Sequence, residues 1–323
     1  MKHIWRKQAI GIDTEATRWT PASAPKFFPP QTSYSFEDVI EKEMDTGATW
    51  TIYTNQQAVV VKHYWSWDIE FIPDLYTFIP FLSAITWTNY KDLPAWVDNL
   101  DWTYKHTFNV PQNAQHCALT VFKKDENLGN LAYSLWMINT ASITINAVWL
   151  STFTTNIISK KWESVSAFTT DYETNRIHFK GANTTLKLWA SLASLTDIVK
   201  VKTATLNFTK NVEPDYIAWN ITPDDINNQS FTIDITAEIQ YNDDTYFNYF
   251  VNNTERAASL EVNTWATWSL AWKFKSINFS EYSKKMDNDT LITQTITAQL
   301  VVNGNTDVFF AELNNTIENL STI

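Results

Sequence analysis

The chain has 323 residues, which is enough for one large domain or two ordinary domains with a hydrophobic core. Its hydrophobic content of 44% and charged content of 18% are those of a globular protein and exclude a disordered chain. The formal net charge of −11 argues against general binding to nucleic acid or to an anionic membrane surface. The single cysteine, Cys117, excludes an intramolecular disulfide and a cysteine-rich zinc site.

Residues 1–30 are expected to form an irregular, extended N-terminal arm. Four prolines in this segment keep the chain out of sheet interiors: Pro21, Pro25, Pro29 and Pro30. No apolar run follows the basic residues at the N-terminus, so we expect no signal peptide. The longest apolar stretch, 71–85, is too short to span a bilayer, and we therefore expect no membrane association.

The next stretch predicts a strand at 33–40, a long polar loop at 41–57 and then a strand–turn–strand–helix unit at 58–86. Val59–Val61 is β-branched and Asp68–Ile72 alternates polar and apolar residues, as strands do. Between them, Tyr64–Trp67 would form a tight turn, although indoles are poor residues for one. Pro73-Asp74 is a typical helix start, and apolar residues follow at three- and four-residue spacing.

Further strands are predicted at 102–110, 117–123 and 139–148, followed by mixed short strands and loops at 151–199. From about residue 200 the same order begins again. A strand at 199–210, a polar loop at 211–230 and a strand at 231–241 precede a short helix at 243–253. Strands at 258–262, 269–279 and 291–302 complete the chain. We therefore expect a mainly β fold built from two tandem sandwich or half-barrel domains, each with one short α-helix.

The glycine count is low and the tryptophan count is high. Average usage of about 7% would give roughly 23 glycines, but the chain has 5, together with 16 tryptophans. Several tryptophans stand where a turn would favour glycine: Trp19, Trp65, Trp67, Trp87, Trp265 and Trp268. In the pair Gly47–Ile52 and Trp265–Leu270, which resemble one another, glycine in one copy stands opposite tryptophan in the other.

Two explanations account for this composition. In the first, most of these positions are glycine in the organism, because some bacteria and their phages read the UGA codon as glycine. Trp102 and Trp272, which lie in strand-like runs, would then be genuine tryptophans. In the second, the chain has a genuinely tryptophan-rich, carbohydrate-binding surface.

No motif in the chain predicts catalysis, a cofactor or a metal. The five histidines form no pair with metal-ligand spacing, and no phosphate-binding loop, dinucleotide fingerprint or nucleophile elbow is present. No two carboxylates stand out as an acid–base pair among the 35 acidic residues. We therefore expect neither an enzyme nor a cofactor-binding protein.

Two segments, with tryptophan read as glycine, resemble the phage tail tube (major tail) protein family of long-tailed phages. The first motif is carried by Gly11, Glu15, Arg18, Trp19 and Thr20. The second, a glycine-containing hairpin that leads to a short helix, is carried by Lys62, Trp65, Trp67 and Asp68. The resemblance extends over most of 9–150 and more loosely beyond. It implies tail-tube-like β domains at 31–155 and 200–323, with connecting strands and loops at 156–199.

The resemblance also implies a structural role in the virion tail. Subunits of that family form rings that stack into a tube, and DNA passes through the lumen without specific binding. Loops 41–57 and 211–230 would contact neighbouring rings, with Gly47, Trp50, Asn55, Pro223, Asp224 and Asp225 as candidate contacts. A ring would need three chains if both halves are tube domains, and six if only one is. Expected partners are further copies and other tail proteins, and synthesis would occur in the host bacterial cytoplasm. The alternative is a tryptophan-rich cell-surface or glycan-binding β-sandwich protein.

Overall fold

The computed structural model describes residues 8–45, 57–93, 103–112, 117–125, 129–174, 176–194, 197–263, 268–286, 292–302 and 308–320. Over these residues the chain is mainly antiparallel β, which confirms the predicted fold class. The first half contains β1 (Ala9–Thr14), β2 (Gln31–Asp45), β3 (Gln57–Phe71), α1 (Ile79–Thr86), β4 (Tyr104–Asn109), β5 (Leu119–Asp125), β6 (Gly129–Asn146), β7 (Thr152–Ser159) and β8 (Trp162–Ser164).

The second half contains β9 (Thr184–Trp189), β10 (Asp197–Val199), β11 (Val201–Thr209), β12 (Val212–Asp215), β13 (Asp225–Asn228), β14 (Thr232–Gln240), α2 (Thr245–Val251), β15 (Arg256–Asn263), β16 (Ser269–Lys285), β17 (Thr293–Leu300) and β18 (Phe309–Asn315). Short 3-10 turns lie at Tyr90–Asp92, Gly181–Asn183 and Leu192–Ser194.

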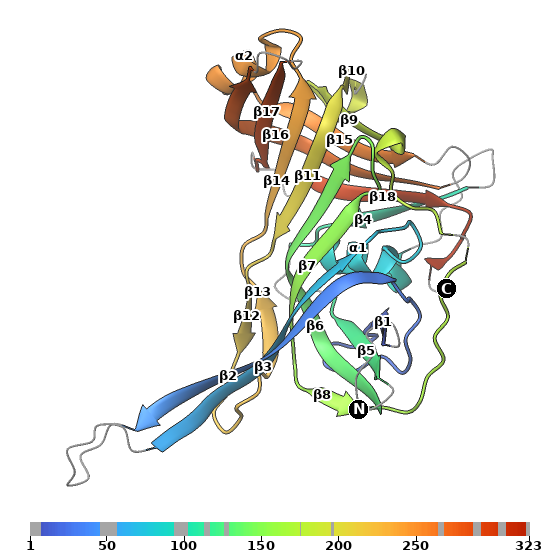
Figure 1. Ribbon diagram of the computed structural model, residues 1–323, viewed down its shortest axis with the longest axis vertical. Coiled ribbons are helices and arrows are strands. Elements are labelled where there is room, and N and C mark those ends of the chain that lie inside the picture. The colour runs from blue at the N-terminus through green and yellow to red at the C-terminus, as the bar shows by residue number, and fades with distance from the viewer. Residues whose placement is uncertain are drawn as a thin grey trace.

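A single sheet runs through the centre of the molecule in the order β2-β3-β7-β6-β11-β14-β17-β16 (Figure 1). Apart from the register shifts described below, successive residues of its strands alternate between the two faces. On β3, for example, Ile69 and Phe71 are buried while Asp68 and Glu70 point to the opposite face. Helix α1 packs on the buried face, where the ring of Phe81 lies 4.8 Å from that of Phe71 and 5.2 Å from that of Phe153. One face of the sheet is therefore core, and the other is polar.

The two halves of the sheet repeat one another. In chain order, β2, β3, β6 and β7 stand in space as β2-β3-β7-β6, and β11, β14, β16 and β17 stand as β11-β14-β17-β16. A helix follows the second strand in each half, α1 after β3 and α2 after β14. The strand order β1-β5-β6 also recurs as β9-β15-β16. By this correspondence β9 is the counterpart of β1, and it lies before residue 200.

Three register shifts fall at matching places in the two units. The first lies between Gln31 and Ser33 on β2 and between Val201 and Thr203 on β11. The second lies between Ile138 and Thr140 on β6 and between Phe279 and Glu281 on β16. The third lies at the start of the β5–β6 and β15–β16 pairings. Since a bulge is a specific local feature of a strand pair, the shared positions align the two units residue by residue.

Several local predictions are wrong. Tyr64–Trp67 is not a turn but the middle of β3, because the in–out alternation of Trp65, Trp67, Ile69 and Phe71 continues without a break. The predicted loop 41–57 is strand at its described ends, in β2 and β3. These two strands are long because they pair with each other from Gln31↔Phe71 to Asp45↔Gln57.

The N-terminal arm and the start of the first helix also differ from prediction. Residues Ala9–Thr14 form β1, which is buried throughout and pairs with β5, so this part of 1–30 is core and not an arm. The first helix begins at Ile79 and not at Pro73, because Asp74 caps a separate turn whose Thr77 amide donates to its Oδ1 at 2.9 Å. The predicted boundary after residue 155 falls inside β7, and the loop 211–230 contains the β12–β13 hairpin.

Candidate assembly surfaces

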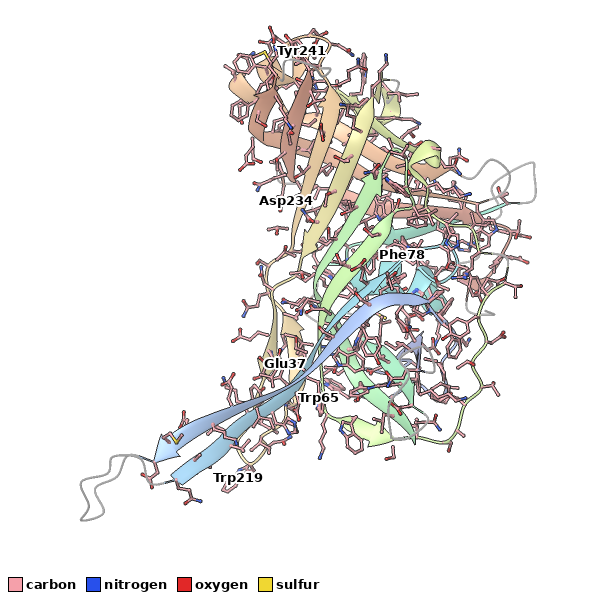
Figure 2. All side chains as sticks on the ribbon, viewed as in Figure 1. Glu37, Trp65, Phe78, Trp219, Asp234 and Tyr241 are labelled. Atoms are coloured by element: carbon pink, nitrogen blue, oxygen red, sulfur yellow. The ribbon has the colours of Figure 1, made fainter. Side chains whose placement is uncertain are left out.

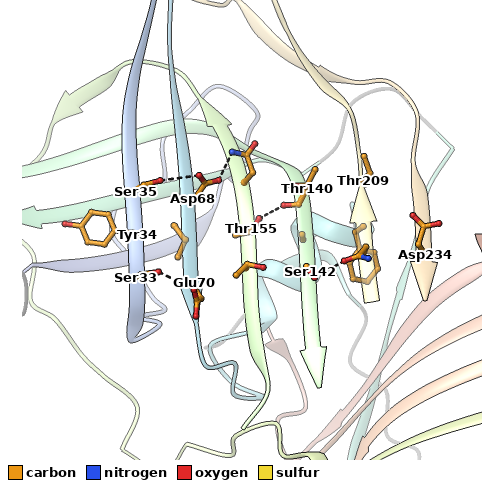
Figure 3. A pocket seen from close by; sticks show the side chains of 16 residues that line it. Ser33, Tyr34, Ser35, Asp68, Glu70, Thr140, Ser142, Thr155, Thr209 and Asp234 are labelled. Atoms are coloured by element: carbon orange, nitrogen blue, oxygen red, sulfur yellow. Dashed lines mark hydrogen bonds between the residues drawn. The ribbon is translucent and has the colours of Figure 1, made fainter. Parts of the chain in front are cut away.

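The polar face of the sheet is continuous across both repeat units. One row of directly opposed residues crosses all eight strands: Ser33, Glu70, Thr154, Ser142, Asn207, Asp234, Gln299 and Asn278. Each side chain in the row is a hydroxyl, an amide or a carboxylate. The middle of this face is hollowed, and Figure 3 shows the side chains that line the hollow, contributed by β2, β3, β7, β6, β11 and β14.

The hollow is acidic. Ser33 and Ser35 donate to Glu70 and Asp68 at 3.4 and 3.2 Å, and Asn156 Nδ2 donates to Asp68 Oδ1 at 2.8 Å (Figure 3). The ion pairs found among the described residues lie elsewhere and do not involve Asp68, Glu70 or Asp234. The face therefore presents carboxylates among neutral hydroxyls and amides, which repel phosphate groups.

Among the described residues, the eight-strand central sheet has an open strand edge at each of its two ends. Among the described residues, β2 has β3 as its only neighbouring strand, and the part of β16 from Asn278 to Lys284 has only β17. The equivalent part of β6 is covered, because β11 pairs with it from Thr203↔Asn146 to Thr209↔Thr140. An exposed strand edge is a template for pairing with another chain.

The outer part of the β2–β3 hairpin projects from the body of the molecule, with the β12–β13 segment beside it (Figure 1). The His63 amide donates to the Ile221 carbonyl at 2.8 Å, and Lys62 Nζ lies 5.7 Å from the centre of the Tyr216 ring. The projecting hairpin is thus supported along one side by the corresponding hairpin of the second repeat unit.

Arg18 fixes the base of β12–β13 to the body of the molecule. Its guanidinium donates to Asp225 Oδ1 at 2.7 Å and to the Ile226 carbonyl at 2.6 Å, and both side chains of the ion pair are about nine-tenths buried. Charge-assisted hydrogen bonds of this kind hold planar groups in one orientation. The conformation of β12–β13 therefore depends on the segment that follows β1.

Glu15 holds the same segment on its other side. Its carboxylate accepts hydrogen bonds from the amides of Trp19 and Leu135 at 3.0 and 2.6 Å and from the Thr120 hydroxyl at 3.3 Å. Burial raises the pKa of Glu15 to about 7, and these hydrogen bonds and the charge of Arg18 act in the opposite direction. Glu15 and Arg18, two residues of the first motif, are thus structural anchors.

The candidate ring-stacking residues fall in two places. Gly47, Trp50 and Asn55 lie outside the described residues. Pro223 is buried and Asp224 is exposed beside β13. Asp225 is buried and ion-paired with Arg18, so its carboxylate faces the interior.

The candidate glycine positions also differ from one another. Trp19 and Trp87 have φ of 71° and 70°, in the left-handed region that favours glycine. Trp65 and Trp67 are buried strand residues, Trp268 packs beside the core before β16, and Trp265 lies outside the described residues. Trp219, which is not among those candidates, has φ of 81° and is fully exposed (Figure 2).

The left-handed tryptophans stand at positions with known glycine preference. Trp19 and Trp219 are each the third residue of a hydrogen-bonded turn, closed by Thr20 N to Thr17 O and by Asn220 N to Ile217 O. Trp87 is the left-handed residue that ends α1, and its amide donates to the Ser83 carbonyl. Its indole packs 5.0 Å from the Phe231 ring. The backbone strain is common to the three positions, although their side-chain surroundings differ.

No group of three or more potential metal ligands occurs within the described part of the chain. Within the same residues, no helix is long and apolar enough to cross a membrane. The Nε2 of the buried histidine His106 donates to the Ile317 carbonyl at 2.8 Å, and burial lowers the pKa of the ring, so its role is structural.

Sequence reasoning missed the acidic row on the polar face and the Arg18–Asp225 ion pair. The alternation of Thr, Ser and Asn in 139–148, with the same pattern in 199–210 and 231–241, was a usable signal for the polar face. No sequence signal links Arg18 to Asp225, because the two residues are far apart in the chain and the contact depends on how β12–β13 folds back.

A comparison with protein-family models matches residues 34–300 to the phage tail tube protein family. A comparison with curated proteins finds no match. The family match covers most of the chain and includes the eight strands of the central sheet except the first residues of β2. By the length of this match, the chain belongs to the phage tail tube protein family.

Proposed function

We propose that this protein is the structural subunit of a phage tail tube, and that its copies form rings which stack into a channel for DNA. The observation that carries the proposal is the central sheet, which has one acidic polar face and an open strand edge on each side. A sheet with two complementary open edges can add copies head to tail, and a head-to-tail interface closes into a ring when the rotation permits it. Closure also removes the exposed edges.

In this proposal the polar face lines the lumen. Asp68, Glu70 and Asp234 would face the DNA, and their charge would let it slide without binding. The buried face and α1 would lie toward the outside of the ring. The hydroxyls and amides between the carboxylates would keep the wall hydrated and without apolar patches.

The repeat within the chain favours a ring of three copies. Each chain carries two units with the same strand order, so three chains would supply the six units of a family ring. Neighbouring rings would meet through the projecting β2–β3 hairpin and the exposed loop that includes Asp224. Other tail proteins would bind the ends of the tube, and the subunit would be made in the host bacterial cytoplasm before assembly into the virion tail. The role is structural and not enzymatic.

Electron microscopy of the purified full-length chain tests this proposal, with its oligomeric mass measured in parallel. The expected result is rings, or tubes of stacked rings, with an open centre. A chain that stays monomeric at high concentration and binds polysaccharide through its exposed indoles would overturn the proposal in favour of a glycan-binding protein.

A further inference from the structure

The junction between the two repeat units inside the chain provides a template for the junction between chains. Inside the chain, the end of β6 pairs with β11, the first strand of the second unit's half of the central sheet. The equivalent strands are β16 and β2, and these carry the two open edges. We propose that β16 of one copy pairs antiparallel with β2 of the next, in the register that β6 and β11 have. This inference rests on the proposed function and assigns the residues of its ring contact.

The shared register shifts show which residues of β16 and β2 are equivalent to the paired residues of β6 and β11. Ser142 lies two residues after the shift residue Thr140, and Ser283 lies two residues after the equivalent Glu281. Asn207 lies four residues after Thr203, and Glu37 lies four residues after Ser33. Because Ser142 is directly opposite Asn207, Ser283 of one copy would be directly opposite Glu37 of the next. By the same equivalence, Lys285 of one copy would be directly opposite Ser35 of the next.

This register keeps both faces of the sheet continuous. Ser35 and Glu37 lie on the polar face of β2, because their partners Asp68 and Ser66 lie on the polar face of β3. Glu281 and Ser283 lie on the polar face of β16, opposite Thr297 and Thr295. A slip of one residue would turn polar side chains toward the core, so only shifts by an even number of residues compete with the proposed register.

The two edges also differ in charge. β16 ends in Lys284 and Lys285, whereas the facing part of β2 carries Glu37 and Asp38, and the side chains of Glu37 and Lys285 are exposed. In the proposed register Lys285 is a diagonal neighbour of Glu37, a distance over which long side chains interact. The edges therefore favour pairing with each other over pairing of either edge with itself.

Paired cysteines test the register. In the full chain, Ser283→Cys combined with Glu37→Cys places the two Cα atoms about 4.5–5.5 Å apart across the joint, within the range that a disulfide spans. Inside one chain the same residues lie seven strand spacings apart, about 34 Å in a flat sheet, so any disulfide must join two copies. The matched control is Ser283→Cys with Ser33→Cys, a shift by four residues that separates the pair by about 13 Å. The native Cys117 is half-buried, and burial raises the pKa of its thiol to about 12, which keeps the thiol protonated during mild oxidation.

The expected result, after mild oxidation, is a covalent three-chain species from the first pair and little cross-linking from the second. If rings form but only the control pair cross-links, the proposed register is wrong and the tube function stands. If rings form and neither pair cross-links, the proposed register is wrong and the tube function stands. If neither rings nor cross-links form from folded chains, the proposed function fails with it.

Charge-reversal variants test the proposed β16–β2 contact independently of the cross-links. Glu37→Lys is expected to lower the yield of rings at least several-fold, and Lys285→Glu in the same chain is expected to restore part of it. The matched control, Glu163→Lys, makes the same charge change on β8, outside the central sheet. A loss of rings as large with Glu163→Lys as with Glu37→Lys would contradict the proposed contact.

A different observation carries a second inference, about the identity of three residues. We infer that positions 19, 87 and 219 are encoded by UGA and are glycine in the native virion. Of the six described non-glycine residues with positive φ, three are these tryptophans, and the other three are Leu135, Asn211 and Asn253. Each tryptophan occupies a turn or helix-end position at which glycine is the favoured residue.

The structure separates these positions from tryptophans that we assign to UGG. Trp136 and Trp272 lie in strands, are fully buried and pack against Phe81 and Phe179, at 5.9 and 6.0 Å between ring centres. The test is to read the gene's codons and to measure peptide masses of the protein from native virions. UGA codons and glycine-containing peptides at 19, 87 and 219, with UGG at 136 and 272, are expected. UGG codons at the first three positions would overturn the inference.

Discussion

Replacement of Trp219 by glycine is expected to stabilise the chain that carries tryptophan at this position. Trp219 has φ of 81° at the third position of the turn that Asn220 N closes with Ile217 O. A non-glycine residue in the left-handed region costs about 1–2 kcal/mol. The side chain has a relative exposure of 104%, so its removal sacrifices no burial. Glycine's extra freedom in the unfolded chain offsets about 0.4–1 kcal/mol, which leaves a net gain of about 0.5–1 kcal/mol.

Two matched variants separate relief of backbone strain from removal of an indole. Trp219→Ala removes the same indole but keeps the Cβ atom, so its effect should be near zero. Trp149→Gly removes another exposed indole, with 73% relative exposure and no positive φ, and should destabilise by about 0.5–1 kcal/mol. The assay is urea unfolding at a concentration where the chain is monomeric, with the transition midpoints compared at a common slope. The reasoning is refuted if Trp219→Gly is no more stable than Trp219→Ala, or if Trp149→Gly gains as much.

Three further predictions concern the N-terminal anchors. Asp225→Asn leaves the Arg18 guanidinium buried without its charged partner and should lower the free energy of unfolding by about 3 kcal/mol. The control is Glu41→Gln, at the exposed pair with Lys62, which should change the free energy of unfolding by under about 1 kcal/mol. Equal losses for the two variants in urea unfolding would contradict the prediction. Because the pKa of Glu15 is raised in the folded state to about 7, the native chain holds a proton that the unfolded chain has lost, so stability should fall as pH rises from about 4.5 to 7, by at most about 1.4 kcal/mol per pH unit. Glu15→Gln should flatten that slope in unfolding measurements, and an unchanged slope would show that other groups cause it. Gly11→Ala would place a Cβ atom 2.4 Å from Pro25 Cβ. Thermal unfolding should show a loss of about 1–3 kcal/mol in the free energy of unfolding. An unchanged midpoint would contradict the close packing of β1 against the segment around Pro25.

The strands and their polar face were accessible from the sequence because they depend on local alternation. The pattern of Asn139–Val148 predicts most of the exposed half of β6, and 231–241 predicts β14 within a residue or two. The same signal could have corrected the supposed turn at Tyr64–Trp67, since Trp65, Trp67, Ile69 and Phe71 keep a period of two. The prediction of a turn came from treating Val59–Val61 and Asp68–Ile72 as two separate strands, although the alternation runs through the residues between them.

Features that depend on pairing between distant segments were not accessible. The register shifts that align the two units appear only when strands are paired, and the sequences around Gln31 and Val201 show no common motif. The edges of β2 and β16 are open because no other described strand pairs with them. A local sequence pattern cannot predict that a strand lacks a neighbour. Strand β18 was missed because it has a short apolar pattern, and its partners β4 and β16 come from opposite halves of the chain.

The most direct test of the central claim is a cryo-electron microscopy reconstruction of the tube formed by the purified chain. The account predicts rings of three chains in which the sheet continues from β16 of one copy into β2 of the next. Asp68, Glu70 and Asp234 should face the lumen. A tube whose polar face points outward, or whose β2 and β16 edges do not meet, would contradict it.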